Sequence, residues 1–279
     1  MLSRSRIIIE RFLQALYAID AEAATERSSW AGRDYRPAVA LFLASFCLII
    51  THYPVLTGSF ERFLLYFPST IGLDSFTLVK ILNRSGYYIL TTYVWRLSWI
   101  FVGFVFLPII LIKLVFKESI RDYGLGVADL SPYVKWIALL VVISIIFAII
   151  GSYNKDVTLY YPFYTLTSRS WADLILWEFL YFLEMICVEF FFRGFLLKSC
   201  KASFGFNAIF VMSLPYMMIH LNKPFTEAVF SVFFGILLGI LALRSRSIWG
   251  CVIIHYSLAL TADIAALIQK NILPGQWWP

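Results

Sequence analysis

The sequence has few charged residues for its size. Only 14% of its 279 residues are charged and 61% are hydrophobic, whereas soluble domains hold about 25% charged and about 45–50% apolar residues. These proportions exclude an ordinary soluble domain and predict a protein that crosses a membrane several times. The net charge of +6 does not indicate nucleic acid as a partner, because the basic residues cluster beside the apolar stretches, where they set membrane topology.

Paired cysteines and the common hydrolase motifs are also missing. The four cysteines lie in apolar stretches or at their ends without a paired short spacing, which argues against a disulfide framework or a zinc ribbon; they are Cys47, Cys187, Cys200 and Cys251. The chain contains neither Gly-x-Ser-x-Gly nor His-Glu-x-x-His, so serine hydrolases and zincins have no sequence support. We expect no cofactor, with zinc left open.

Long apolar runs organise the chain. Runs of about 18–25 residues are long enough to cross a bilayer, and together they predict an all-α bundle of about seven spans. Residues 1–36 predict a basic amphipathic helix on the membrane surface, with a solvated helical arm as the alternative. Residues 37–152 then form the N-terminal spans and residues 173–268 the catalytic core. The predicted spans are 37–56, 87–112, 134–152, 173–197, 205–221, 226–243 and 248–268.

The distribution of lysine and arginine predicts the orientation of these spans. Of the 23 basic residues, 14 flank the spans on the side of the N-terminus and 7 on the opposite side, while Arg96 and Arg193 lie within spans. Because basic flanks stay on the cytoplasmic side, we expect an integral protein of the cell (inner) membrane with a cytoplasmic N-terminus.

Ionisable residues inside the apolar spans are the strongest functional signal. Glu184, Glu189 and Arg193 lie within one apolar run, and a charge at this depth costs several kcal/mol unless it is paired or wet. Glu189 and Arg193 are four residues apart and form an ion pair on one helix face. His220 and His255 lie in later spans, so the least costly arrangement turns all of these groups toward a common cavity.

Such a group of side chains contains the functional groups that peptide-bond hydrolysis needs. A buried carboxylate beside histidines holds and deprotonates water, and a second imidazole or an arginine stabilises an oxyanion. No covalent intermediate is needed. The alternative for Glu189 and Arg193 is a structural ion pair that locks the fourth span.

Three segments in the C-terminal half resemble a known family. Residues 189–196 (EFFFRGFL), His220 to Pro224 with Glu227, and the stretch that ends at His255 are similar to the CAAX protease and bacteriocin-processing (CPBP, Abi-type) family of glutamic intramembrane endopeptidases. The resemblance covers about residues 173–268. It implies a membrane-embedded hydrolase that acts on a membrane-delivered peptide or protein.

The resemblance also assigns positions to the family motifs. In order, the motifs Glu-Glu-x-x-x-Arg, Phe-x-x-x-His and His-x-x-x-Asn fall on Val188, Glu189 and Arg193, on Tyr216 and His220, and on His255 and Ala259. Val188 therefore stands at the glutamate to which the family's water activation is credited, and Ala259 at its oxyanion asparagine. Glu184 lies one turn before Val188 and Asp263 two turns after His255, so both are candidate substitutes, and Glu227 is a further supporting candidate.

We interpret the chain as an intramembrane endopeptidase. In this interpretation Glu189 activates water, with Arg193 fixing it, while His220 positions the water and His255 stabilises the oxyanion. One alternative is a catalytically inactive membrane scaffold or immunity-type binding protein of the same fold. A second is a zinc-dependent protease whose ligands are Glu189, His220 and His255.

Overall fold

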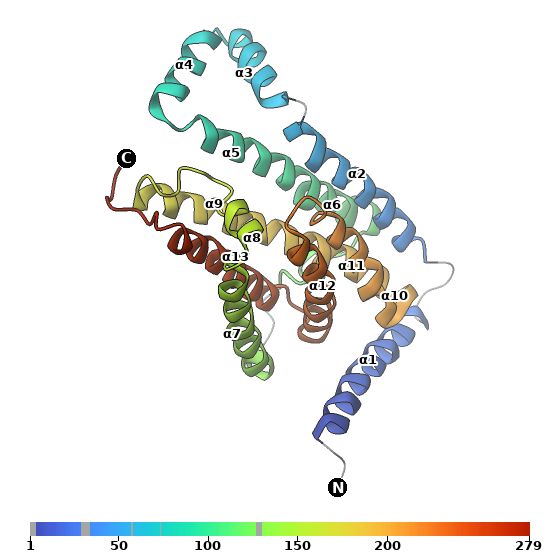
Figure 1. The fold of residues 1–279 in the computed structure, drawn as a ribbon. Helices are drawn as coiled ribbons and strands as arrows, with labels where there is room; N and C mark the ends of the chain where they lie inside the picture. The colour runs from blue at the N-terminus through green and yellow to red at the C-terminus, as the bar shows by residue number, and fades with distance from the viewer. Residues whose placement is uncertain (1–3, 29–33, 57, 73, 127–129) are drawn as a thin grey trace. The chain divides into compact units, whose positions relative to one another are not determined.

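The chain folds into helices. The computed structural model describes residues 4–28, 34–56, 58–72, 74–126 and 130–279, and every regular element in these ranges is helical (Figure 1). The predicted all-α class is therefore confirmed. The longer elements are α1 (Arg4–Ser28), α2 (Arg36–Leu56), α3 (Ser59–Thr70), α4 (Ser75–Ser85), α5 (Tyr88–Phe101), α7 (Val134–Gly151), α9 (Trp171–Glu189), α11 (Ala208–Met218), α12 (Phe225–Ser245) and α13 (Trp249–Gln269).

Short helical elements join these helices. Two π-helical turns and one α-helical turn continue α5 as far as residue 116, and a third π-helical segment links α9 to α10. The short elements are η1 (Val102–Phe106), α6 (Leu107–Ile110), η2 (Leu111–Phe116), η3 (Ile120–Tyr123), η4 (Ser131–Tyr133), α8 (Lys155–Tyr160), η5 (Phe190–Leu196), α10 (Leu197–Phe204) and η6 (Gly205–Asn207).

Five helical stretches of the described chain are long and apolar enough to cross a membrane, and each coincides with a predicted span. They are Arg36–Tyr53, Tyr88–Phe116, Ser131–Gly151, Phe225–Ser245 and Trp249–Gln269. The chain is thus a polytopic membrane protein.

The other two predicted spans differ from the structure. Residues 173–197 do lie in one continuous helical stretch, from α9 to α10. Because of its acidic residues, this stretch is not among the five that are long and apolar enough to cross a membrane. The predicted span 205–221 is too long, because α11 has only 11 residues, about 16 Å of helix at 1.5 Å per residue. Turn hydrogen bonds follow α11, from the amides of His220, Leu221 and Lys223, and Pro224 is the N-cap residue of α12.

The chain divides into two compact units. The first unit comprises the described residues of Met1–Ser45, Pro108–Ser144 and Val188–His255. In it the C-terminal half of α1 packs against α10 and η6, with Ile19 and Ala23 buried. The Asp20 carboxylate accepts a hydrogen bond from the amide of Phe206 at 2.8 Å. Part of the predicted surface helix is thus bound to the protein.

Two glycines bring α11 and α12 together in the first unit (Figure 1). A Cβ atom on Gly235 would lie 3.0 Å from Oγ of Ser213, and one on Gly239 would lie 3.0 Å from Cγ2 of Ile209. Small residues four apart allow this close approach of helix backbones, so the pair serves as a packing face. The contact fixes α11, which carries Tyr216.

The second unit comprises Phe46–Leu107, Ile145–Cys187 and Tyr256–Pro279, in their described residues. Its core is an aromatic cluster with one small member: Leu90, Tyr164, Trp177, Tyr181, Met185 and Ala259. The rings of Trp177 and Tyr181 stack with centroids 5.2 Å apart. Large rigid rings bury much apolar area with little loss of conformational entropy, and here they enclose Ala259.

Candidate active site

Glu189 and Arg193 form a fully buried ion pair in the first unit. The residues are 0% and 3% exposed, and Nη1 of Arg193 donates to Oε1 of Glu189 at 3.0 Å. Glu189 ends α9 and Arg193 lies in the π-helical segment η5; such segments occur often at functional sites. A carboxylate without this partner would be costly to bury, so the predicted pair is present and holds the charge of Glu189.

His255 of α13 completes the group around the carboxylate. Its Nδ1 lies 2.6 Å from the same Oε1 of Glu189. A carboxylate only accepts hydrogen bonds, so in the neutral imidazole Nδ1 carries the proton and Nε2 keeps its lone pair. Among the described residues, Oε2 of Glu189 has no hydrogen-bond partner. The result is a carboxylate–imidazole pair in which Nε2 of His255 and Oε2 of Glu189 can accept further hydrogen bonds.

Tyr216 connects this pair to the second histidine. Its ring lies under the guanidinium of Arg193, with 3.9 Å between Cζ and the ring centroid, a cation–π contact. The same ring is 4.7 Å from that of His220 and 6.2 Å from that of His255, between centroids. Three predicted positions therefore gather around one tyrosine, and Glu189 joins them through Arg193 and His255.

His220 is held by the backbone of α11. Its Nδ1 lies 2.9 Å from the carbonyl oxygen of Tyr216, which accepts a hydrogen bond, so Nδ1 is the protonated nitrogen. The imidazole is buried and presents Nε2 as an acceptor. His220 thus belongs to the cluster through Tyr216, whereas His255 belongs to it through Glu189.

Sequence reasoning gave no role to two aromatic residues of this cluster. Tyr216 was identified only as a motif position, and its place one turn before His220 is the signal that favours contact with that ring. Phe234 of α12 packs edge-on against His255 with centroids 5.8 Å apart. Nothing in the sequence distinguishes Phe234 from the other phenylalanines of α12.

The three supporting candidates have other partners. In the second unit, Glu184 forms an ion pair with Arg96 at 2.6 Å, and Asp263 accepts a hydrogen bond from Nε1 of Trp177 at 2.6 Å. In the first unit, Glu227 pairs with Lys223 one turn away at 2.7 Å. Each of these contacts has a structural explanation that involves none of the four main site residues.

The site contains few side chains that could bind a metal ion. Zinc sites in enzymes use three protein ligands, and the described residues contain no group of three His, Cys, Asp or Glu side chains close enough to hold a metal ion. Glu189 and His255 supply two donors that already bond to each other. The donor set therefore does not fit the zinc alternative.

The fold and the site define a class: a polytopic helical membrane protein with a buried Glu–Arg–His group. Residues 169–261 match the family described as Rce1-like, type II CAAX prenyl endopeptidase Rce1-like. The resemblance inferred from the three motifs is thereby confirmed for this third of the chain, which is similar to a family described as endopeptidases. No curated protein and no solved structure gives a match.

The two departures from the family motifs are both buried. Val188 is 4% exposed and Ala259 5%, and Ala259 lies within the aromatic cluster of the second unit. An asparagine there would need space and hydrogen-bond partners inside a ring cluster.

This gives a first prediction. Ala259→Asn is expected to lower the free energy of unfolding by about 1–3 kcal/mol, because it overpacks the cluster and buries an amide. Thermal unfolding of the purified protein in detergent measures the effect. Ala262→Asn, at a half-buried position of the same helix, is the matched control. Unchanged stability of Ala259→Asn would contradict the packing argument.

Proposed function

We propose that the protein is an intramembrane endopeptidase that hydrolyses a peptide bond of a membrane-delivered peptide or protein. One observation carries the proposal: Oε1 of Glu189 accepts hydrogen bonds from both Arg193 and His255. Arg193 favours the ionised carboxylate, and the carboxylate in turn orients the imidazole. This is how catalytic histidines are commonly prepared to act as bases.

In this mechanism Glu189 and His255 activate water as a unit. Glu189 is 0% exposed and His255 7%, so water reaches the imidazole more readily than the carboxylate. Nε2 of His255 takes a proton while the water oxygen attacks the carbonyl carbon of the substrate. The adjacent carboxylate stabilises the imidazolium that forms.

The same imidazolium serves the second half of the reaction. Its Nε2–H donates to the developing oxyanion and then passes the proton to the leaving amine as the carbon–nitrogen bond breaks. His220 offers Nε2 as an acceptor and positions the attacking water. Arg193 holds Glu189 and does not touch the substrate.

The family description suggests the kind of substrate. It names a CAAX prenyl endopeptidase. The first substrate to assay is therefore a peptide that carries a prenyl group near its C-terminus. We further propose a cytoplasmic N-terminus in the cell membrane, on the basis of the basic residues that flank the spans.

A second candidate is an inactive membrane scaffold of the same fold. Val188 and Ala259 favour it, because both replace residues to which the family's chemistry is credited. In that case the Glu189–Arg193–His255 group is a structural network, and its members affect stability without affecting cleavage.

A cleavage assay on purified protein separates these candidates. The wild-type protein is expected to cleave a prenylated peptide, equally well with and without a metal chelator. His220→Ala is expected to lower kcat by a factor of about 10²–10⁴, the contribution of a positioned acid–base group, and to keep its unfolding midpoint near that of the wild type. Full cleavage by His220→Ala would contradict its role, no cleavage by the wild type would favour the scaffold, and loss with chelator would favour zinc.

A further inference from the structure

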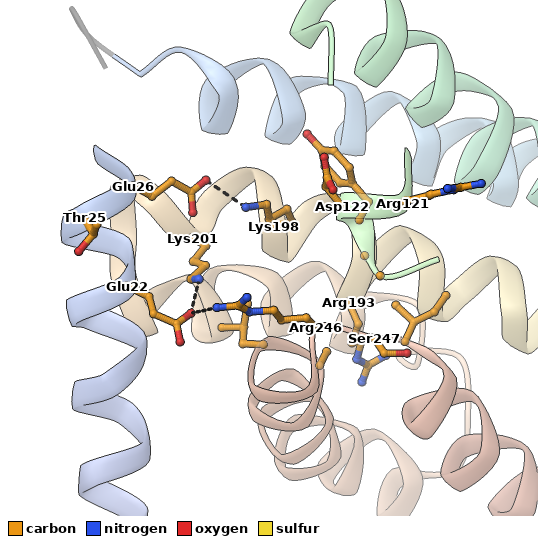
Figure 2. Close-up of a pocket in the computed structure, with 16 residues that line it drawn as sticks. Glu22, Thr25, Glu26, Arg121, Asp122, Arg193, Lys198, Lys201, Arg246 and Ser247 are labelled. Carbon is orange, nitrogen blue, oxygen red and sulfur yellow. Dashed lines mark hydrogen bonds and ion pairs between the residues drawn. The ribbon is translucent and has the colours of Figure 1, made fainter. Parts of the chain in front are cut away.

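A pocket of about 590 Å³ lies in the first unit (Figure 2). It is lined by residues of α1, η3, η5 and α10, and by the end of α12 with the residues that follow it. Its walls carry five cationic and three acidic side chains, an excess of positive charge. The cationic residues are Arg121, Arg193, Lys198, Lys201 and Arg246. Lys198, Lys201 and Arg246 lie beside α1, whereas the Arg121 side chain points away from them (Figure 2). A concave site with an excess of positive charge suits a small anionic group.

Two acids of α1 already face three of these cations (Figure 2). Glu26 pairs with Lys198 at 3.0 Å, and Glu22 pairs with Lys201 at 2.8 Å. Glu22 also lies 3.8 Å from Arg246, whose side chain is 77% exposed. The carboxylates of α1 therefore occupy cations that an anion from outside would also contact.

Neighbouring cations stabilise the ionised carboxylate of Glu22. Burial raises the pKa of Glu22, but the hydrogen bond from Lys201 and the charges of Lys201 and Arg246 outweigh this effect, so its pKa is below the ordinary value. The carboxylate is thus an anion near neutral pH. It competes with any other anion for the same cations.

Arg193 connects this pocket to the candidate active site. It lines the pocket, its side chain is fully buried, and Nε and Nη2 have no hydrogen-bond partner in the described part of the chain. The guanidinium faces Glu189 and the ring of Tyr216, so Arg193 links the two sites without acting as a ligand in the pocket.

The basic segments that line the pocket belong to the side of the membrane with 14 of the 23 lysines and arginines. By the positive-inside rule this is the cytoplasmic side, where anionic phospholipids make the leaflet surface negative. Basic pockets between helices on that side bind phosphorylated headgroups. The ligand chemistry that fits is therefore a phosphate group at the membrane surface.

We propose that this pocket binds the phosphate group of an anionic phospholipid, or free phosphate, through Lys198, Lys201 and Arg246, and that Glu22 and Glu26 are its internal competitors. The proposal concerns binding alone and does not depend on hydrolysis. Because Arg193 lies at both sites, the pocket is placed to influence the Glu189–His255 pair.

Two substitutions with opposite expected effects on phosphate binding test the proposal. Arg246→Asn removes an exposed cation, and asparagine tolerates the left-handed backbone at this position (φ 53°). It is expected to weaken binding about fivefold, since one basic residue near the surface contributes about 1 kcal/mol. Glu22→Gln removes a competing carboxylate and is expected to strengthen binding. A residue with a merely structural role would not produce this gain.

The measurement is the shift in unfolding midpoint of the full-length protein in detergent. It is titrated with short-chain phosphatidylglycerol, short-chain phosphatidylcholine and inorganic phosphate at constant ionic strength. Lys223→Gln is the control, because Lys223 is paired with Glu227 in the same unit and does not line the pocket.

The outcomes are distinct. Binding of phosphatidylglycerol and phosphate supports a site for the phosphate group alone, and binding of phosphatidylglycerol without phosphate supports a lipid headgroup site. Phosphatidylglycerol that binds no more tightly than phosphatidylcholine overturns the proposal. So does an equal loss of affinity in Lys223→Gln and Arg246→Asn, or a weaker affinity in Glu22→Gln.

Discussion

Glu189→Gln is expected to reduce cleavage by a factor of about 10²–10⁴, the usual contribution of a general acid–base group. Glutamine keeps the size of the side chain and still accepts the hydrogen bond of His255, but it has no charge. Without the carboxylate, the imidazolium that forms when His255 takes a proton from water is no longer stabilised. The loss is expected in kcat, measured with the purified protein and a prenylated peptide.

Glu184→Gln is the matched control for this prediction. It makes the same chemical change in the same helix, and it also breaks a hydrogen-bonded pair with an arginine, Arg96. It is expected to lower stability while each folded molecule retains its kcat. An equal fall of kcat in both variants would show that the effect of Glu189 passes through the fold and not through the reaction.

Arg193→Met is expected to lower the free energy of unfolding by about 3–5 kcal/mol, the cost of leaving a buried charge without its ionic partner. The Glu189 carboxylate would keep only the hydrogen bond of His255. Methionine fills much of the space of the arginine stem, so the loss of charge dominates over the loss of volume. Denaturant unfolding in detergent micelles measures the difference from the wild type.

The double variant Glu189→Gln/Arg193→Met completes the test. Removing both charges is expected to restore part of the stability, because no unpaired charge remains in the interior. Lys223→Met, which breaks a partly exposed pair with Glu227, is expected to cost about 1 kcal/mol or less. Arg193→Met with the stability of the wild type would rule out the pair as a structural element.

Patterns within single helices were predictable from the sequence. Glu189 and Arg193 are one turn apart, so their ion pair follows from helix geometry, and Gly235 and Gly239 indicate a packing face in the same way. Five of the seven spans predicted from apolar runs coincide with helices that are long and apolar enough to cross a bilayer, because the length of an apolar run can be read directly from the sequence. Each of these features depends on residues near one another in the chain.

Contacts between helices were not predictable. The pairing of His255 with the same oxygen that Arg193 contacts depends on how α13 lies against α9, which no local pattern specifies. The partner of Glu184 is Arg96, 88 residues away, and sequence reasoning instead placed Glu184 beside Val188. The length of α11 was also overestimated, because the apolar residues Ile219 and Leu221 follow the point where the helix ends, at Met218.

The π-helical segment η5 determines how the two ends of the helical stretch from α9 to α10 are rotated relative to each other. A π turn holds more residues than an α turn, and one residue of an α-helix corresponds to a rotation of about 100°. The segment therefore sets the rotational phase between Glu189 before it and Lys198 and Lys201 after it. Removing one residue from η5 would turn these lysines away from α1 while leaving Glu189 in place. Seven residues thus determine which way the C-terminal end of this helical stretch faces.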